Sequence, residues 1–162
     1  MGNQTFKFDQ VKDELVKVIL FLACAIISNA KATVVQILHT NDNHSFLDHS
    51  DRDPKRGGYA RLKNMIDDLK SDAAKKNIPT LVVDAGDFLE GNLYFMADNG
   101  RKVLNIHNQI KYDASVLGNH DYLMGTEQLD QLLGDTQPDF ALLGANVYVD
   151  KRYQNIREKL KR

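Results

Sequence analysis

Four short apolar segments, separated by stretches long enough for helices, constrain the fold of this chain more than any other feature. They are rich in valine, isoleucine and leucine, as buried strands are. They span residues 33–38, 80–85, 114–117 and 140–143. Between them, apolar residues recur at helical spacing in residues 59–76, 101–110 and 127–133. Pro79 and Gly134 are expected to end the first and last of these helices. Strands joined by helical crossovers form a parallel sheet with helices packed against it. The sequence therefore predicts an α/β domain of order βαβαβαβ.

The N-terminal segment carries features of an export signal. Residues 18–27 form an apolar run, shorter than the about 20 residues that a membrane-spanning helix needs. Residues 30–32 (Ala-Lys-Ala) follow as a small-x-small cleavage pattern. We expect residues 1–32 to be a signal peptide that sends the chain to the periplasm or outside the cell, with no stable membrane span. The charges before the apolar run are balanced, which leaves an amphipathic first helix or a misplaced start codon as alternatives. A lipoprotein signal at Cys24 fits less well.

Composition and net charge indicate a globular protein and argue against a nucleic-acid partner. The chain has 162 residues, about one domain, and its 43% hydrophobic and 27% charged residues are typical of a globular protein. A formal net charge of −1 gives no field that would attract nucleic acid. We expect no nucleic-acid partner, one domain over residues 33–150, and a basic tail with some helical character over residues 151–162.

Polar clusters directly follow the first three predicted strands. They span residues 39–44, 84–87 and 118–121. Parallel strands bring their carboxyl ends to one edge of the sheet, where ligand sites form. Asp42 and His44 are two residues apart, so they can face the same ion from an extended segment. Each cluster alone fits a solvated loop, a turn or a helix cap. Together they predict a metal site, and a set of imidazole, carboxylate and amide donors favours zinc, manganese, iron or cobalt over calcium.

Five motifs between residues 34 and 147 carry a family resemblance. They read ILHTNDNHS, GGYARL, LVVDAGDFLEGN, YDASVLGNHD and LLGANV, in that order. With them the chain resembles the calcineurin-like metallophosphoesterases, and within these the 5′-nucleotidase/UDP-sugar hydrolase group. The resemblance implies a half-sandwich with one mostly parallel sheet, which is half of the family's four-layer αββα fold.

The resemblance also implies a role for each matching residue. Asp42 and His44 correspond to ligands of a first divalent ion, Asp87 to the carboxylate that bridges two ions, and Asn119 to a ligand of the second. His120 corresponds to the catalytic imidazole that contacts the phosphate. The implied reaction is hydrolysis of a nucleotide or related phosphate ester by water activated between two ions about 3.5–4 Å apart.

Some positions depart from the pattern of the group. Leu123 stands where an aspartate commonly orients the catalytic imidazole. Unless another carboxylate takes over, we expect weaker assistance by His120, within the about 10²- to 10⁴-fold range that such groups contribute. Asp121 replaces a more usual glutamate and is expected to support the metal ligands from behind. Asp84 is expected to bond to a ligand histidine, and His107 to lie on the surface.

The family pattern also includes later histidine ligands, in a Gly-His and a Gly-His-x-His segment. No histidine follows His120 in this chain. We therefore expect the N-terminal portion of a truncated domain, with an apolar sheet face left uncovered and open to self-association or a partner chain. Two alternatives stay open: an inactive remnant that still folds and binds metal or a partner, and a plain α/β binding domain in which the motif residues are structural.

Overall fold

The computed structural model describes Lys17 and residues 34–161. The expected signal peptide, residues 1–32, lies outside the described residues apart from Lys17. Within the described part, no helix has both the length and the apolar character needed to cross a membrane.

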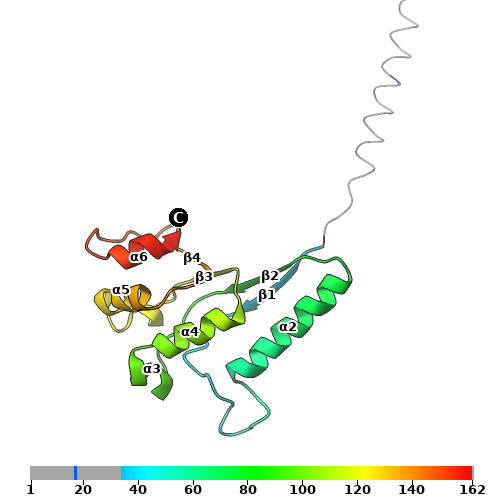
Figure 1. Cartoon of the computed structure of the whole chain (residues 1–162), viewed down its shortest axis with the longest axis horizontal. Coiled ribbons are helices and arrows are strands. Elements are labelled where there is room, and N and C mark those ends of the chain that lie inside the picture. The colour runs from blue at the N-terminus through cyan, green and yellow to red at the C-terminus, as the bar shows by residue number, and fades with distance from the viewer. Residues whose placement is uncertain (1–16, 18–33, 162) are drawn as a thin grey trace, which may run out of the picture. The chain divides into compact units, whose positions relative to one another are not determined.

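One sheet of five parallel strands organises the described part, and each strand lies beside its neighbours in the sequence. Figure 1 labels all of these strands except the last. This confirms the predicted α/β class with a parallel sheet. The first strand begins and ends slightly later than predicted, and the fifth strand was not predicted. The strands are β1 (Gln36–Thr40), β2 (Thr80–Asp84), β3 (Ala114–Val116), β4 (Ala141–Leu143) and β5 (Leu160–Lys161).

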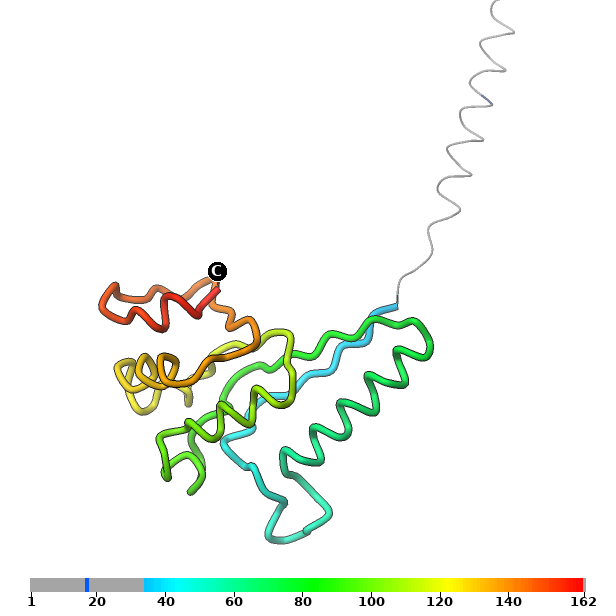
Figure 2. Tube along the Cα trace, in the orientation of Figure 1, coloured from blue at the N-terminus to red at the C-terminus, as the bar shows by residue number. Residues whose placement is uncertain are grey.

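Helices occupy the connections between the strands. In Figure 2 the chain leaves β1, passes through a long loop and returns along α2. The three predicted helices are present, the basic tail forms a short helix, and a six-residue helix after β2 was missed. The helices are α2 (Tyr59–Lys75), α3 (Leu93–Asp98), α4 (Arg101–Ile110), the 3₁₀ helix η1 (His120–Tyr122), α5 (Thr126–Asp135) and α6 (Gln154–Lys159).

Gly134 does not end α5, contrary to the prediction. The helix runs through this glycine to Asp135. A Cβ at Gly134 would lie 2.7 Å from Nδ2 of Asn155 in α6, closer than such atoms pack. Gly134 therefore serves the contact between the two helices, and the glycine that looked like a stop signal is a packing residue.

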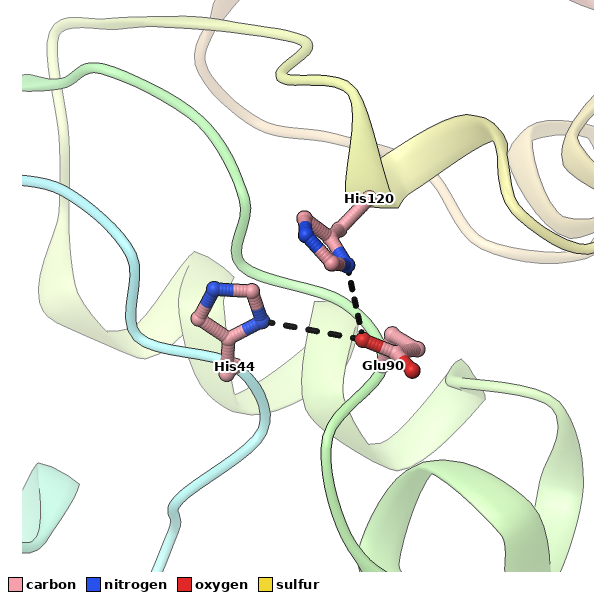
Figure 3. A group of neighbouring side chains, drawn as sticks. All are labelled: His44, Glu90 and His120. Carbon is pink, nitrogen blue, oxygen red and sulfur yellow. Dashed lines mark hydrogen bonds and ion pairs between the residues drawn. The ribbon is translucent and has the colours of Figure 1, made fainter.

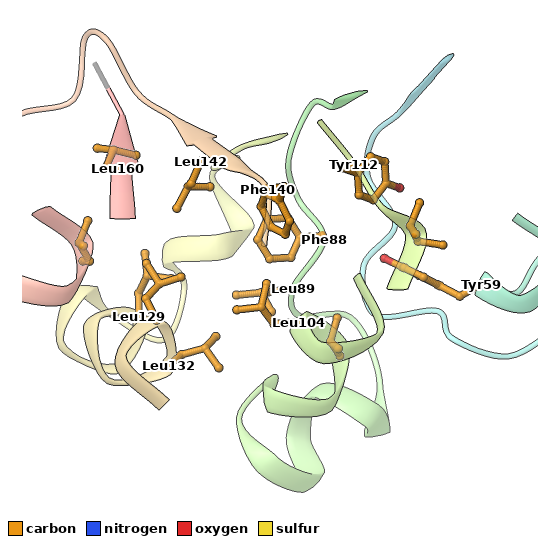
Figure 4. Packing of buried hydrophobic residues seen from close by; sticks show 14 of the residues in the cluster. Tyr59, Phe88, Leu89, Leu104, Tyr112, Leu129, Leu132, Phe140, Leu142 and Leu160 are labelled. Atoms are coloured by element: carbon orange, nitrogen blue, oxygen red, sulfur yellow. The ribbon is translucent and has the colours of Figure 1, made fainter. Parts of the chain in front are cut away.

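The helices pack against one face of the sheet and leave the other face open. Strands that follow one another in order, joined by right-handed crossovers, place successive helices on the same side. On the covered face Val82, Leu142 and Leu160 are buried with helix residues in one apolar cluster (Figure 4). On the opposite face, Ile37 is 61% and Leu143 is 43% exposed. The predicted uncovered apolar face is thus present in the described part of the chain.

Candidate metal centre

The carboxyl ends of β1, β2 and β3 open into loops that are hydrogen-bonded to one another. After β1, the N–H groups of Asp42 and His44 donate to the carbonyl oxygens of Gly86 and Asp87, both at 2.9 Å. After β3, the N–H of His120 donates to Asp87 Oδ1 at 2.8 Å. Residues that are far apart in the sequence therefore meet at one edge of the sheet, as expected from the parallel topology.

Several residues of these loops have a left-handed backbone, which residues other than glycine adopt only rarely. The φ angle is 52° at Asp42, 42° at His44, 54° at Asp87 and 64° at Glu90. Such conformations cost free energy and persist only where surrounding contacts hold them, which is common at binding and catalytic sites. Here the hydrogen bonds between the loops provide those contacts.

Asp42, His44 and Asp87 form the first group of donor atoms. One ligand atom from each lies within 4.8 Å of the other two, and His44 Nε2 is 3.7 Å from Asp42 Oδ1. Asp87 is buried, His44 is partly buried and Asp42 is exposed, so the group opens toward solvent. Two carboxylates and an imidazole match the ligand preferences of divalent ions such as zinc, manganese and iron. This donor set fits a divalent metal ion.

A second group combines both histidines with a carboxylate that sequence reasoning missed (Figure 3). Glu90 Oε2 is 2.9 Å from His120 Nδ1 and 3.8 Å from His44 Nδ1. The two imidazole rings meet edge to face, with their centroids 4.7 Å apart. Glu90 lies three residues after Asp87, within the motif LVVDAGDFLEGN, and that proximity was the only signal in the sequence.

Asp121 supports the site from beneath, in agreement with its expected role. Its buried carboxylate accepts hydrogen bonds from the N–H groups of Asp87 and Leu89, both at 2.9 Å, and of Gly118 at 2.8 Å. These donors favour the charged carboxylate, but burial outweighs them and raises the pKa of Asp121 to about 6. One side chain thus ties the loop after β2 to the loop after β3.

Two glycines allow these loops to approach each other. A Cβ at Gly118 would lie 2.1 Å from Asp87 Oδ1, and a Cβ at Gly86 would lie 2.5 Å from the Gly118 nitrogen. Gly86 also has a φ of 93°, which favours glycine. A larger residue at Gly118 would clash with the Asp87 carboxylate, and one at Gly86 would push the loop after β2 away from the Gly118 backbone.

Asp84 does not bond to a ligand histidine, so that prediction is wrong. Its buried carboxylate accepts hydrogen bonds from Thr40 Oγ1 at 2.5 Å, from Asn43 Nδ2 at 3.1 Å and from the Gly86 N–H at 3.0 Å. Burial raises the pKa of Asp84. Its nearest histidine is His107, at 3.9 Å. Asp84 therefore fixes the start of the loop that carries Asp42 and His44.

His107 was expected on the surface and is fully buried instead. Its ring stacks between Phe88 and Tyr112, with centroid distances of 4.6 and 4.4 Å. Within the described residues, neither ring nitrogen has a hydrogen-bond partner. Burial lowers the pKa of His107 to about 3, so the ring is neutral near pH 7.

The remaining site residues lie at the start and end of η1. Asn119 is exposed and directly precedes His120, so its backbone is next to the bond that joins His120 to Asp87. Leu123 is 58% exposed and follows the last residue of η1. Its side chain offers no polar atom to His120.

Comparison with known families matches residues 35–160 to the calcineurin-like phosphoesterase domain. The chain is 34% identical to the 5′-nucleotidase of Homo sapiens over 138 residues, which is 80% of this chain and 23% of that protein. It is 35% identical to the snake venom 5′-nucleotidase of Crotalus adamanteus over 142 residues, or 82% of this chain and 23% of that protein. The chain thus spans about a quarter of the length of these curated relatives.

Solved structures show the same similarity. The NAD nucleotidase of Haemophilus influenzae superposes with a TM-score of 0.65 at 28% identity, over 78% of this chain and 23% of that one. The 5′-nucleotidase precursor of Thermus thermophilus superposes with a TM-score of 0.63 at 27% identity, over 78% of this chain and 24% of that one. The fold expected for the described residues is therefore confirmed.

Proposed function

We propose a function from one premise: this chain belongs to the calcineurin-like phosphoesterase family, whose domain matches residues 35–160. Enzymes of this family are hydrolases that use divalent metals. On that basis the chain is the N-terminal portion of a metal-dependent phosphoester hydrolase of the 5′-nucleotidase type. The observation that carries the proposal is the convergence of Asp42, His44 and Asp87, with donor atoms within 4.8 Å, at the carboxyl edge of the sheet.

We assign the ligands as follows. Asp42 and His44 would hold one ion, Asn119 would hold a second, and Asp87 would contribute to both. The donor types and the close grouping of the first three support this assignment. These four residues provide fewer ligands than two ions require, so water or other protein segments complete the coordination. When bound, the ions would lower the pKa of a water molecule and stabilise the leaving oxygen.

His120 is the catalytic residue in this proposal. Its ring lies beside the donor group, 4.7 Å from the His44 ring, and it is only partly buried, so a substrate can reach it. We assign its imidazole to contact the phosphate and stabilise the charge that develops there. Asn119, a neutral neighbour, adds no charge that would repel an anionic substrate.

The names of the relatives support a substrate class, and the N-terminal sequence supports a location. Proteins named as 5′-nucleotidases, including venom enzymes, point to nucleotides or related phosphate esters as substrates. Residues 1–32 are proposed as an export signal for the periplasm or the cell exterior, residues 33–150 as the catalytic portion, and residues 151–162 as a tail that adds the last strand. A second candidate is a catalytically inactive remnant that folds and binds metal.

Metal binding by the purified chain tests the proposal. We expect Mn²⁺ or Zn²⁺ to bind and to support hydrolysis of a generic phosphate ester. Loss of a partner that only orients a ligand typically costs about 10- to 100-fold in metal affinity, so Asp87→Asn, which alters a ligand itself, should cost at least about tenfold. Isothermal titration calorimetry measures the affinity, and a phosphate-release assay measures the hydrolysis.

Asp139→Asn is the matched control for this experiment. Asp139 pairs with Lys111 at 2.6 Å on the surface, remote in sequence from the strand-end loops, so its loss should leave metal affinity unchanged. Equal affinity in the wild type and Asp87→Asn would contradict the metal centre. Metal binding without hydrolysis in the wild type would favour the inactive remnant.

We also propose that the uncovered sheet face of the 162-residue chain binds a second copy of the chain. Exposed Ile37 and Leu81 are paired neighbours on β1 and β2, and exposed Val116 and Leu143 are paired neighbours on β3 and β4. Exposed apolar side chains gathered on one sheet face mark an interaction surface. Sedimentation should give a mass that rises with concentration, and the double variant Leu81→Lys, Leu143→Lys should remain monomeric.

Met96→Lys controls for the added charge. Met96 is an equally apolar and more exposed residue, 72% exposed, in α3 and outside the sheet. This variant should associate as the wild type does. A wild type that is monomeric throughout, or a double variant that associates equally, would rule out this interface.

A further inference from the structure

We propose that Glu90 is the positioning residue for His120. Glu90 would thus perform the orienting task that Leu123 cannot. The inference rests on the proposed function for the role of the oriented ring, whereas the contact itself belongs to the folded chain.

The loop holds Glu90 in place by contacts on both sides. The residue before it, Leu89, is buried and donates its N–H to Asp121. The residue after it, Gly91, packs so closely on the His44 backbone that a Cβ would lie 2.7 Å from the His44 carbonyl oxygen. Glu90 itself has a φ of 64°. Its backbone is therefore fixed between the loop that carries His44 and the loop that carries His120.

The two nitrogens of His44 face different carboxylates, and Nδ1 of His120 faces Glu90. His44 turns Nε2 toward Asp42, at 3.7 Å, and Nδ1 toward Glu90, at 3.8 Å. His120 turns Nδ1 toward Glu90 at hydrogen-bonding distance, 2.9 Å. An ionised carboxylate can only accept hydrogen bonds, so the His120 nitrogen that faces it carries the proton. Glu90 thus selects the Nδ1–H form of the ring and leaves Nε2 for the substrate.

This arrangement differs from a third metal ligand, although His44, Glu90 and His120 lie close enough to hold an ion. The short contact between Glu90 and His120 is a hydrogen bond, and an ion there would have to displace its proton. Around metal sites, a carboxylate that does not itself bind the ion often accepts a hydrogen bond from the outer nitrogen of an imidazole. Glu90 holds Nδ1 of His120 in the same way, at 2.9 Å.

The proton position on His120 tests the inference directly. Long-range ¹H–¹⁵N correlation spectra of the metal-free, ¹⁵N-labelled chain report it, at a pH where the ring is neutral, and His120→Asn identifies the signals. An imidazole free in water favours the proton on Nε2, so a proton on Nδ1 is diagnostic. The wild type should show Nδ1–H.

Two amide substitutions test the charge and the reach of Glu90. Glu90→Gln keeps the length but replaces the acceptor-only carboxylate by an amide that can also donate to Nδ1, and Glu90→Asn withdraws the group by one methylene while tolerating the left-handed backbone. The asparagine variant should lose Nδ1–H, and the glutamine variant should show a lower fraction of Nδ1–H than the wild type, with backbone spectra otherwise unchanged. A wild type without Nδ1–H, or an asparagine variant that retains it, would overturn the positioning role.

Addition of Zn²⁺ separates this inference from the proposed function. If Zn²⁺ binds and the Nδ1 proton of His120 persists, Glu90 positions the ring. If Zn²⁺ removes that proton, Glu90 and His120 are ligands and the inference fails. If Zn²⁺ does not bind, the proposed metal centre fails, while the metal-free spectra still decide the role of Glu90.

Discussion

Replacement of His120 by asparagine should lower kcat for phosphate-ester hydrolysis by about 10²- to 10⁴-fold, the usual contribution of a catalytic imidazole. The metal affinity should hardly change, because His120 is not one of the donor residues Asp42, His44 and Asp87. The KM should also change little if the ring acts mainly in the transition state. Steady-state kinetics with saturating Mn²⁺, together with calorimetric titration of Mn²⁺, measures all three quantities.

His49→Asn is the control for this prediction. His49 is exposed and lies in the loop before α2, so the same substitution there should leave kcat unchanged. A loss of metal affinity in His120→Asn would move His120 from the catalytic role into the ligand set. A kcat within a factor of a few of the wild type would remove it from the reaction.

Substitution of His120 should therefore lower kcat, whereas substitution of Asp87 should lower the metal affinity, although a hydrogen bond joins the two residues. That bond uses the His120 N–H, which every non-proline residue retains on substitution. The backbone link, and with it the position of Asp87, survives the loss of the imidazole. This separation lets the two proposed roles be measured independently.

The sequence predicts the parallel sheet and the meeting of its loops well, because both follow from the order of apolar runs. Strands and helices that bury a long apolar face, such as β2 and α4, can be recognised from the spacing of their apolar residues. The missed elements are short. α3 has six residues and β5 has two, and β5 is defined by its pairing with β4 rather than by its own composition. Such elements depend on tertiary contacts that no local pattern encodes.

The candidate site also combines features that the sequence pattern predicts with features that depend on tertiary contacts. The convergence of Asp42, His44 and Asp87 at one edge of the sheet could be predicted, because each follows a strand of the parallel series. Glu90 could not, because its role depends on a left-handed turn that aims its side chain back at two histidines. Leu123 stands where the family commonly has an aspartate, and this difference indicated that another carboxylate would be needed near His120.

His107 was misplaced because a histidine in a helix was assumed to face water. In α4 it shares a face with Val103, Leu104 and Ile110, all of them buried. The helical spacing of these four residues was available in the sequence. What the sequence could not supply is the aromatic cage from other segments, including Phe88, that completes the burial.

This buried histidine should make the fold sensitive to acid. The pKa of His107 is about 3 in the folded chain, against 6.5 in an exposed chain, so between these values the unfolded state binds the proton and the folded state does not. The free energy of unfolding therefore falls as the pH drops from 6.5 toward 3. At about 1.4 kcal/mol per pH unit, the loss should reach about 4–5 kcal/mol, a large part of the about 5–15 kcal/mol that holds a typical domain together.

Comparison of the wild type with His107→Phe isolates this contribution. Phenylalanine can occupy the space between Phe88 and Tyr112 and leaves no ring nitrogen without a partner, so the variant should be at least as stable at pH 7. Urea unfolding at a series of pH values gives both curves. Asp84 and Asp121 are present in both proteins, and their raised pKa values act in the opposite direction. Asp84 Oδ1 lies 3.9 Å from His107 Nε2, so the difference between the curves reports His107 together with its interaction with Asp84. That difference should grow as the pH falls below 6.5, and parallel curves would show that protonation of His107 does not oppose folding.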